Sequence, residues 1–295
     1  MDVINRINKQ IADNDLNGAL GDLQKLNTCF RELVGLLYQH KVELPHRWYE
    51  YYETIGIKFE LNVDSIIELY IMKDDLPKGF IYHDLSSIYL LSRSLLETYL
   101  TFYYSYILPK TEEEGLVNYL IFKISGLVQR QNYGKGDLKP MPPDRLNKRE
   151  SERLVIEKYQ KELLSLPFFQ SLPIKEAEKA KLLKGKYAKR FSFIELIQLS
   201  ELKNILFCDM WRLYSNYAHC ELIGLLQINS YADDTDSING ALYGTLTNAL
   251  IIMSVMIKNF TSVFRNTGVE HIDIPAMDEE VMTLMQFWYL MGTEH

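Results

Sequence analysis

The sequence predicts an all-α protein, a multi-helix bundle, and three observations support this fold class. Fifteen glycines and nine prolines in 295 residues fall below average usage, which favours long helices joined by few turns. Apolar residues recur at i, i+3, i+4 and i+7 in one segment after another, which is the spacing of amphipathic helices. The strict apolar–polar alternation that marks strands is nearly absent.

Followed along the chain, this spacing predicts a series of helices bounded by capping and breaking residues. Asp75 and Pro77 end the third helix, and Thr111 with Glu114 forms a capping box that opens the fifth. Asp278 precedes the last amphipathic segment. The predicted helices cover residues 2–14, 16–40, 46–73, 84–107, 113–132, 148–165, 174–186, 192–203, 204–228, 238–265 and 278–292.

One composition break divides the chain. The stretch QNYGKGDLKPMPPDRLNKRES, residues 131–151, is rich in glycine, proline and basic residues and predicts an exposed loop. The later stretch KEAEKAKLLKGKYAKR holds seven basic residues against two acids, which indicates either a solvated helical face or a local contact surface for anions. We therefore expect a single domain over 1–295, with a helical core from 16–132 and 192–292 and with 133–190 as a loop and charged helical excursion.

Composition and charge restrict the class of function. The formal net charge of −7 argues against a broadly basic nucleic-acid-binding surface and leaves room for a local basic patch. Three scattered cysteines without a CxxC pair predict neither a disulfide framework nor a structural zinc site, and they favour a reducing compartment. These cysteines are Cys29, Cys208 and Cys220. No signal peptide is apparent at the amino end, so we expect a cytoplasmic protein.

The longest uncharged run, residues 239–257, is close to the length that spans a membrane. It contains Gly240 and Gly244 at the GxxxG spacing, which can mark helix pairing in membranes. Threonine and asparagine residues interrupt the run and no basic cluster precedes it. We interpret it as a buried central helix, with a transmembrane helix as the alternative.

Short motifs of the common enzyme classes are missing from the sequence. It holds no Walker A loop, dinucleotide fingerprint, HExxH, nucleophile elbow or kinase signature set. No group of His, Cys or carboxylate residues has metal-ligand spacing. We therefore expect neither a cofactor nor a metal.

Two polar groups interrupt strongly apolar helices. The first is Arg93 with Glu97, four residues apart and hence on one helix face, where a salt bridge can form. Leucines surround the pair, so the helix is predicted to be central. The pair is interpreted as orienting two helices, with a contribution to a functional site as the alternative.

The second group lies in MWRLYSNYAHCELIGLLQI, residues 210–228. At 100° per residue, Arg212 and His219 are about 20° apart around a helix, and Asn216 falls between them. Asp209 extends this polar stripe by one turn, while Glu221 points the opposite way. A guanidinium binds phosphate oxygens bidentately and an imidazole moves protons near neutral pH, so the stripe suits a phosphodiester.

Arg212 and His219 also carry a resemblance. Their spacing resembles the R-x4–6-H motif of the HEPN superfamily, compact helical domains that include metal-independent ribonucleases and toxins. The contexts YSNYAHCE and SRSLLETYL are similar to a prokaryotic all-helical family of unknown function. The resemblance implies a HEPN-like core with extra N-terminal helices and a helical insertion. It also implies catalytic roles for Arg212 and His219, support from Asn216, and a homodimer that cleaves RNA in a defence or stress system.

Other interpretations of the same residues remain open. Arg265 and His271 match the motif a second time, and Leu213 departs from the polar residue that the superfamily favours after the arginine. Many superfamily members bind without cleaving. The main alternative is therefore a non-catalytic helical module that binds a protein partner or a second copy of itself, with the polar stripe as an ordinary solvent-facing or interface surface.

Overall fold

Every regular secondary-structure element in the part of the chain that the structure describes is helical. The computed structural model describes residues 3–40, 44–71, 84–133, 142–219, 221–231, 234–266 and 277–293. Within these ranges there is no strand, so the predicted all-α fold class is confirmed. The chain divides into two compact units, the first formed by Met1–Tyr103 with Phe193–His295 and the second by Tyr104–Ser192.

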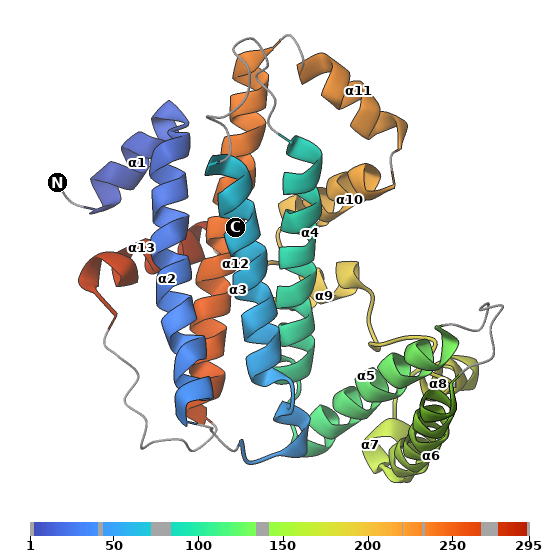
Figure 1. Ribbon diagram of the computed structural model, residues 1–295. Coiled ribbons are helices and arrows are strands. Elements are labelled where there is room, and N and C mark those ends of the chain that lie inside the picture. Colours follow the sequence, from blue (N-terminus) through green and yellow to red (C-terminus); the bar gives the residue numbers. More distant parts are fainter. Residues whose placement is uncertain are drawn as a thin grey trace. The chain divides into compact units, whose positions relative to one another are not determined.

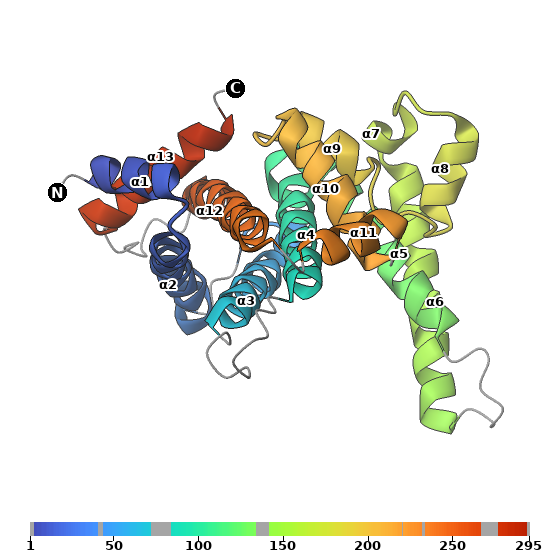
Figure 2. The same ribbon diagram turned by 90° about the horizontal axis from the view of Figure 1, so that it is seen from above.

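Unit 1 is built around long helices that run alongside one another (Figure 1). Its elements are α1 (Val3–Asp13), α2 (Leu16–His40), η1 (Arg47–Tyr49), α3 (Tyr52–Ile71), α4 (Leu85–Phe102), α9 (Phe193–Leu199), α10 (Ile205–Ala218), α11 (Leu222–Tyr231), α12 (Thr235–Asn266) and α13 (Glu279–Thr293). From above, α12 lies beside α2 and α4, and α3 lies between α2 and α4 on the other side, with α10 against α4 and with α1 and α13 together (Figure 2).

An aromatic cluster holds the centre of unit 1. Phe260 of α12 contacts Phe30, Tyr52 and Phe102, with ring centroids 5.1, 4.4 and 5.7 Å away. The Tyr52 hydroxyl donates to the carbonyl of Phe260 at 2.6 Å, which satisfies the polar end of a ring that is otherwise fully buried. These contacts join α12 to α2, α3 and α4, which come from the first 102 residues of the chain.

The apolar run at 239–257 lies within α12, which is the single helix of the described residues long and apolar enough to cross a membrane. In its most apolar window 72% is buried inside the protein. A Cβ added at Gly240 or Gly244 would meet nothing within 4 Å, so the small size of these glycines serves no close helix contact. The observed burial is that of a core helix.

Unit 2 is a smaller helical unit. It contains α5 (Glu112–Asn132), α6 (Pro143–Ser165), α7 (Pro167–Gln170) and α8 (Glu176–Leu183), and the π-helical turn η3 (Tyr103–Ile107) precedes α5. A largely buried ion pair links its elements: Arg190 binds Glu114 at 2.7 Å, donates to Asn118 at 2.8 Å and stacks on Phe168. The structure thus groups α5 with this unit, whereas 113–132 was predicted to belong to the core.

The predicted caps can be compared with the observed ones. The Thr111 hydroxyl accepts from the backbone N–H of Glu114, as in the predicted capping box. The Glu114 carboxylate accepts in return from the N–H of Lys110, one residue before Thr111, so the second bond of the box is shifted by one residue. Asp278 accepts from the N–H of Glu280 and caps α13 as expected. Asp75 and Pro77 lie outside the described residues.

Candidate functional site

The polar stripe lies on α10. Its first two members form an ion pair, with Arg212 Nη1 2.9 Å from Asp209 Oδ1. Their side chains are 58% and 64% exposed, so the pair sits at the surface. Arg212 leans toward the amino end of the helix, as side chains on α-helices do, and it therefore meets Asp209 rather than His219.

The predicted helix 204–228 is wrong at its centre, because α10 ends at Ala218 and α11 begins at Leu222. His219 is the C-cap of α10, with φ −104° and ψ 7°, and its N–H donates to the carbonyl of Ser215 at 3.2 Å. The N–H of Glu221 then donates to the carbonyl of Asn216 at 2.9 Å and turns the chain. Arg212, Asn216 and His219 thus follow one helix to its carboxyl end, where the exposed His219 ends the polar stripe.

The chemistry open to this stripe depends on Asp209. An exposed ion pair contributes only about 0–1 kcal/mol, so a phosphate could displace the carboxylate from Arg212 at little cost. The carboxylate nonetheless repels an approaching anion and neutralises the guanidinium in the absence of a ligand. The stripe as folded is therefore a surface with one ion pair and an accessible imidazole.

Arg93 and Glu97 form the predicted salt bridge on α4, with Arg93 Nε 2.8 Å from Glu97 Oε1. Trp211 of α10 joins the pair: its indole N–H donates to Glu97 Oε1 at 3.0 Å, and the Arg93 guanidinium lies 5.0 Å from the ring centroid. The two charged side chains keep 21% and 26% of their surface exposed. This arrangement fixes α10 against α4 beside the stripe, which is the helix-orienting role expected from the sequence.

Helix α11 has the reverse of the polarity expected for a surface helix. The side facing α10 carries Gly224, whose added Cβ would lie 3.6 Å from Tyr217, and Gln227, which accepts a hydrogen bond from the Tyr217 hydroxyl at 2.9 Å. The outward side carries four aliphatic residues that are between 46% and 69% exposed. These residues, Leu222, Ile223, Leu225 and Leu226, are called the α11 apolar face below.

This face was not predicted from the sequence, although a signal was present. The segment ELIGLLQI lacks the polar residue at every third or fourth position that would keep one side of a surface helix hydrophilic. The segment was expected inside one long helix, and the break at His219 is what brings it to the surface.

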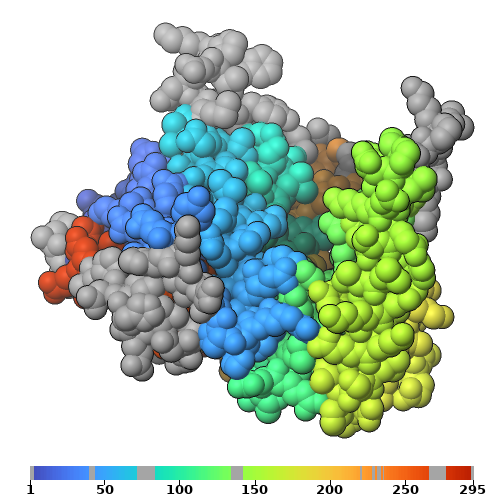
Figure 3. All heavy atoms as spheres, turned by 60° about the horizontal axis from the view of Figure 1, so that its bottom comes forward, coloured from blue at the N-terminus to red at the C-terminus, as the bar shows by residue number. Residues whose placement is uncertain are grey.

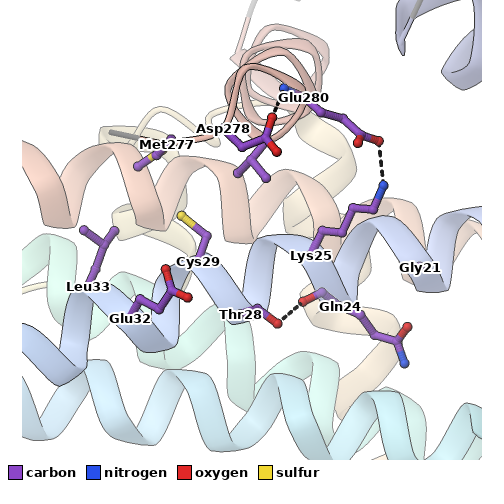
Figure 4. A pocket seen from close by; sticks show the side chains of 11 residues that line it. Gly21, Gln24, Lys25, Thr28, Cys29, Glu32, Leu33, Met277, Asp278 and Glu280 are labelled. Carbon is purple, nitrogen blue, oxygen red and sulfur yellow. Dashed lines mark hydrogen bonds and ion pairs between the residues drawn. The ribbon is translucent and has the colours of Figure 1, made fainter. Parts of the chain in front are cut away.

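A cavity of about 660 Å³ lies between α2 and the start of α13 (Figure 4). Cys29 and Glu32 line it, and Lys25 is held at its edge by Glu280 at 2.5 Å. Burial, with Glu32 nearby, raises the pKa of the Cys29 thiol to about 11. A thiol that stays protonated at neutral pH is a poor nucleophile, so the surroundings of Cys29 in this cavity disfavour its reactive thiolate form.

Two further findings concern metal ligands and similarity to known proteins. In the part of the chain that the structure describes, no three His, Cys, Asp or Glu side chains are grouped as metal ligands would be. Comparison with family models, with curated proteins and with solved structures finds no significant match to the chain. Of the residues singled out earlier, Cys220 and His271 lie outside the described residues, and Arg265 is exposed on α12.

Proposed function

We propose that this protein is a non-catalytic helical interaction protein that binds a second copy of itself through the α11 apolar face. The reversed polarity of α11 carries the proposal. Single exposed aliphatic residues are ordinary on protein surfaces, whereas a contiguous group on one helix is typical of an interaction site. Covering this group with an apolar partner would remove it from water and supply the driving force for association.

Charge favours a protein partner over a membrane. No lysine or arginine occurs between residues 213 and 257, and Glu221, Asp234 and Asp236 flank α11. Helices that lie on anionic membranes are instead rich in basic residues. In an antiparallel pair about a two-fold axis, the acids after α11 of one copy approach the amino end of α11 of the other. That end of a helix carries a partial positive charge, and the Glu221 carboxylate at the same end offsets it, so charge alone does not set the orientation of the pair.

The size of the face sets the expected affinity. Burying four half-exposed aliphatic side chains on each copy contributes on the order of 8 kcal/mol, at about 1 kcal/mol for each. Loss of translational and rotational freedom on association costs about 4–15 kcal/mol. We therefore expect a weak, concentration-dependent dimer rather than an obligate one.

Sedimentation velocity between about 5 and 500 μM tests the proposal. The wild-type protein should move toward a dimer as its concentration rises, and Leu226→Glu should remain monomeric. Leu61→Glu on α3 is the matched control, because Leu61 and Leu226 are 54% and 57% exposed. A monomeric wild type at 500 μM, or equal disruption by Leu61→Glu, would show that α11 does not bind a second copy.

A second candidate function is a metal-independent, HEPN-like endoribonuclease. The observation that favours it is the exposure of Arg212 and His219 along one helix that leads directly into α11. In this function both would be catalytic, Asn216 would support them, and the RNA 2′-hydroxyl would attack the adjacent phosphodiester. A dimer through α11 would bring two polar stripes to one interface, because His219 is three residues from Leu222. A cytoplasmic ribonuclease toxin of a defence or stress system would have these features.

Labelled RNA incubated with micromolar protein in EDTA at pH 6–8 tests this candidate. Cleavage should occur with the wild type and be lost in Arg212→Ala and His219→Ala at unchanged helical content. Arg145→Ala, an exposed arginine of α6, is the control and should cleave normally. Intact RNA with the wild type rejects the enzyme and leaves the dimer proposal to its own measurement.

A further inference from the structure

The charge of the protein is divided unequally between its two units. Residues 104–192 hold 18 Lys and Arg against 11 Asp and Glu, a net charge of +7. The remaining residues hold 14 Lys and Arg against 28 Asp and Glu, a net charge of −14. The overall value of −7 therefore conceals a basic unit, and charge asymmetry of this kind indicates a polyanionic partner for the basic part.

Part of this positive charge is free to act on a partner. In α8, Lys179 forms an ion pair with Glu176 at 3.0 Å, and Lys181 forms one with Glu178 at 2.8 Å. Among the exposed lysines of unit 2 that form no ion pair with a carboxylate of the described residues, four lie near the end of α8. They are Lys158, Lys161, Lys184 and Lys186, called the lysine surface below.

The backbone at the end of α8 positions two of these lysines. Gly185 adopts φ +67° and closes a Schellman motif, in which Gly185 and Lys186 donate to the carbonyls of Leu182 and Lys181, each at 3.0 Å. Gly185 is buried, and an added Cβ there would lie 2.8 Å from Val128 of α5. Because the glycine faces α5, its two neighbours Lys184 and Lys186 extend into solvent.

Helix α6 brings the other two lysines to the same region. The side chain of Gln160 donates to the carbonyl of Leu183 at 2.7 Å, which ties the second half of α6 to the end of α8. Lys158 and Lys161 are within one helical turn of this contact and are exposed. Figure 3 shows one face of α6 in yellow-green. Around α6, Lys161 points about 100° and Lys158 about 160° away from Gln160, so these two lysines extend the lysine surface outward from the end of α8 and do not face it.

We propose that the lysine surface binds the phosphodiester backbone of a single-stranded nucleic acid. Lysine is depleted at protein–protein interfaces, which rely on aromatic and arginine anchors, so a surface of free lysines is unlike a protein docking site. A membrane-surface helix would need an aligned apolar side. The exposed apolar residues of α6 are spread over about half of the helix circumference, and Glu150, Glu157 and Lys161 lie among them, so α6 has no such side. These apolar residues are Leu146, Leu154, Val155 and Leu164.

Tyr187 supports a single strand over a duplex. It follows Lys186 directly, its side chain is 45% exposed, and the Lys181 ammonium lies 5.6 Å from its ring centroid. Single-strand binding sites combine basic groups that follow the backbone with aromatic rings on which bases stack. One exposed ring beside the free lysines supplies both elements. The proposal is independent of the α11 apolar face.

Fluorescence anisotropy with labelled 20-nucleotide oligo(rU) and oligo(dT) tests this inference on the full-length protein. If four phosphates are neutralised, affinity should fall about 50-fold between 50 and 200 mM NaCl. Lys184→Gln with Lys186→Gln should reduce that fall to about 7-fold and weaken binding at 50 mM salt. The control is Lys9→Gln with Lys58→Gln, which removes the same charge from exposed lysines of unit 1 and should bind as the wild type does.

The outcomes separate the possible partners. Binding of either oligonucleotide that weakens only in the unit 2 variant supports the proposal, and the ratio of the two affinities distinguishes RNA from DNA. No binding at 50 mM salt, or equal weakening by the unit 1 control, overturns it. Binding to vesicles containing phosphatidylserine without binding to either oligonucleotide also overturns it. Circular dichroism of both variants establishes that loss of binding is not loss of fold.

Discussion

Cys29 shows at the scale of one residue how position controls reactivity. Burial, followed by the nearby Glu32 carboxylate, raises the pKa of its thiol from 9.0 to about 11. Since the folded-state pKa is the higher one, the folded protein favours the protonated thiol. The resulting contribution to the free energy of unfolding is present below pH 9 and is lost as pH rises toward about 11.

We expect iodoacetamide to alkylate Cys29 slowly at pH 8 and faster as pH rises toward 11, because the thiolate is the reactive form. The measurement uses the variant Cys208→Ala with Cys220→Ala, so that one thiol remains. Glu32→Gln should increase the rate at pH 8 by lowering the pKa, and the urea-unfolded protein provides the reference rate. A folded protein that reacts at pH 8 as fast as the unfolded one would contradict this expectation.

Other single residues show how much of the site was readable from the sequence. The pairing of Arg93 with Glu97 followed from their spacing on a helix, and so did the position of Asp209 beside Arg212. Trp211 was not recognised as the third member of the Arg93–Glu97 group. Its bond to Glu97 joins residues 114 positions apart, and helical periodicity carries no information about such contacts.

At the scale of elements, two glycines of unit 2 should respond oppositely to substitution by alanine. Gly185 has φ +67°, and an added Cβ would meet Val128 at 2.8 Å and the carbonyl of Ile124 at 3.1 Å. Gly126 is an exposed residue within α5, and a Cβ added there would meet no atom within 4 Å. Gly185→Ala should destabilise the protein by about 1–3 kcal/mol, from the left-handed backbone and the collision.

Gly126→Ala should stabilise the protein by about 0.5–1 kcal/mol, because alanine loses less conformational entropy in a helix. Urea unfolding followed by far-ultraviolet circular dichroism measures both variants against the wild type. Opposite shifts of the midpoint are expected. A neutral Gly185→Ala would show that the end of α8 can rearrange, and Gly185 would then not be what directs Lys184 and Lys186 into solvent.

Helix positions were predictable because local spacing determines them, while helix ends depend partly on distant contacts. The predicted 16–40 and 278–292 correspond to α2 and α13 within one residue. The break at His219 was missed because no glycine or proline marks it. What accompanies it is the contact of Gly224 with Tyr217, which forms only once α11 folds back on α10.

At the scale of the whole molecule, the sequence indicated a helical core interrupted by a charged segment, and the structure confirms that the chain is all-α. The pairing of α2 with α12 was beyond prediction, because the residues that meet, such as Phe30 and Phe260, are more than 200 positions apart and carry no mark of each other. The opposite net charges of the two units were present in the composition. They became visible only when the boundaries at 103 and 193 were known.

The burial of α12 within the whole molecule favours a core helix over a transmembrane helix. Its apolar window has a mean hydropathy of 1.6, which satisfies the composition of a membrane span, yet 72% of that window is buried by other parts of the protein. Exposing it to lipid would require the aromatic cluster around Phe260 to come apart, and replacing a buried phenylalanine contact of this kind costs about 3–5 kcal/mol even for one side chain. We therefore expect α12 to stay buried in the core and not to contact lipid or detergent.

Triton X-114 phase separation of a detergent-free preparation measures this directly, and the wild type should remain in the aqueous phase. Leu226→Glu serves as the diagnostic variant, because it alters the α11 apolar face and leaves α12 unchanged. Recovery of both proteins in the detergent phase would mean that α12 leaves the core and meets lipid. If the wild type enters the detergent phase and Leu226→Glu does not, the contact is made by α11, and its apolar face then serves a membrane in place of a second copy.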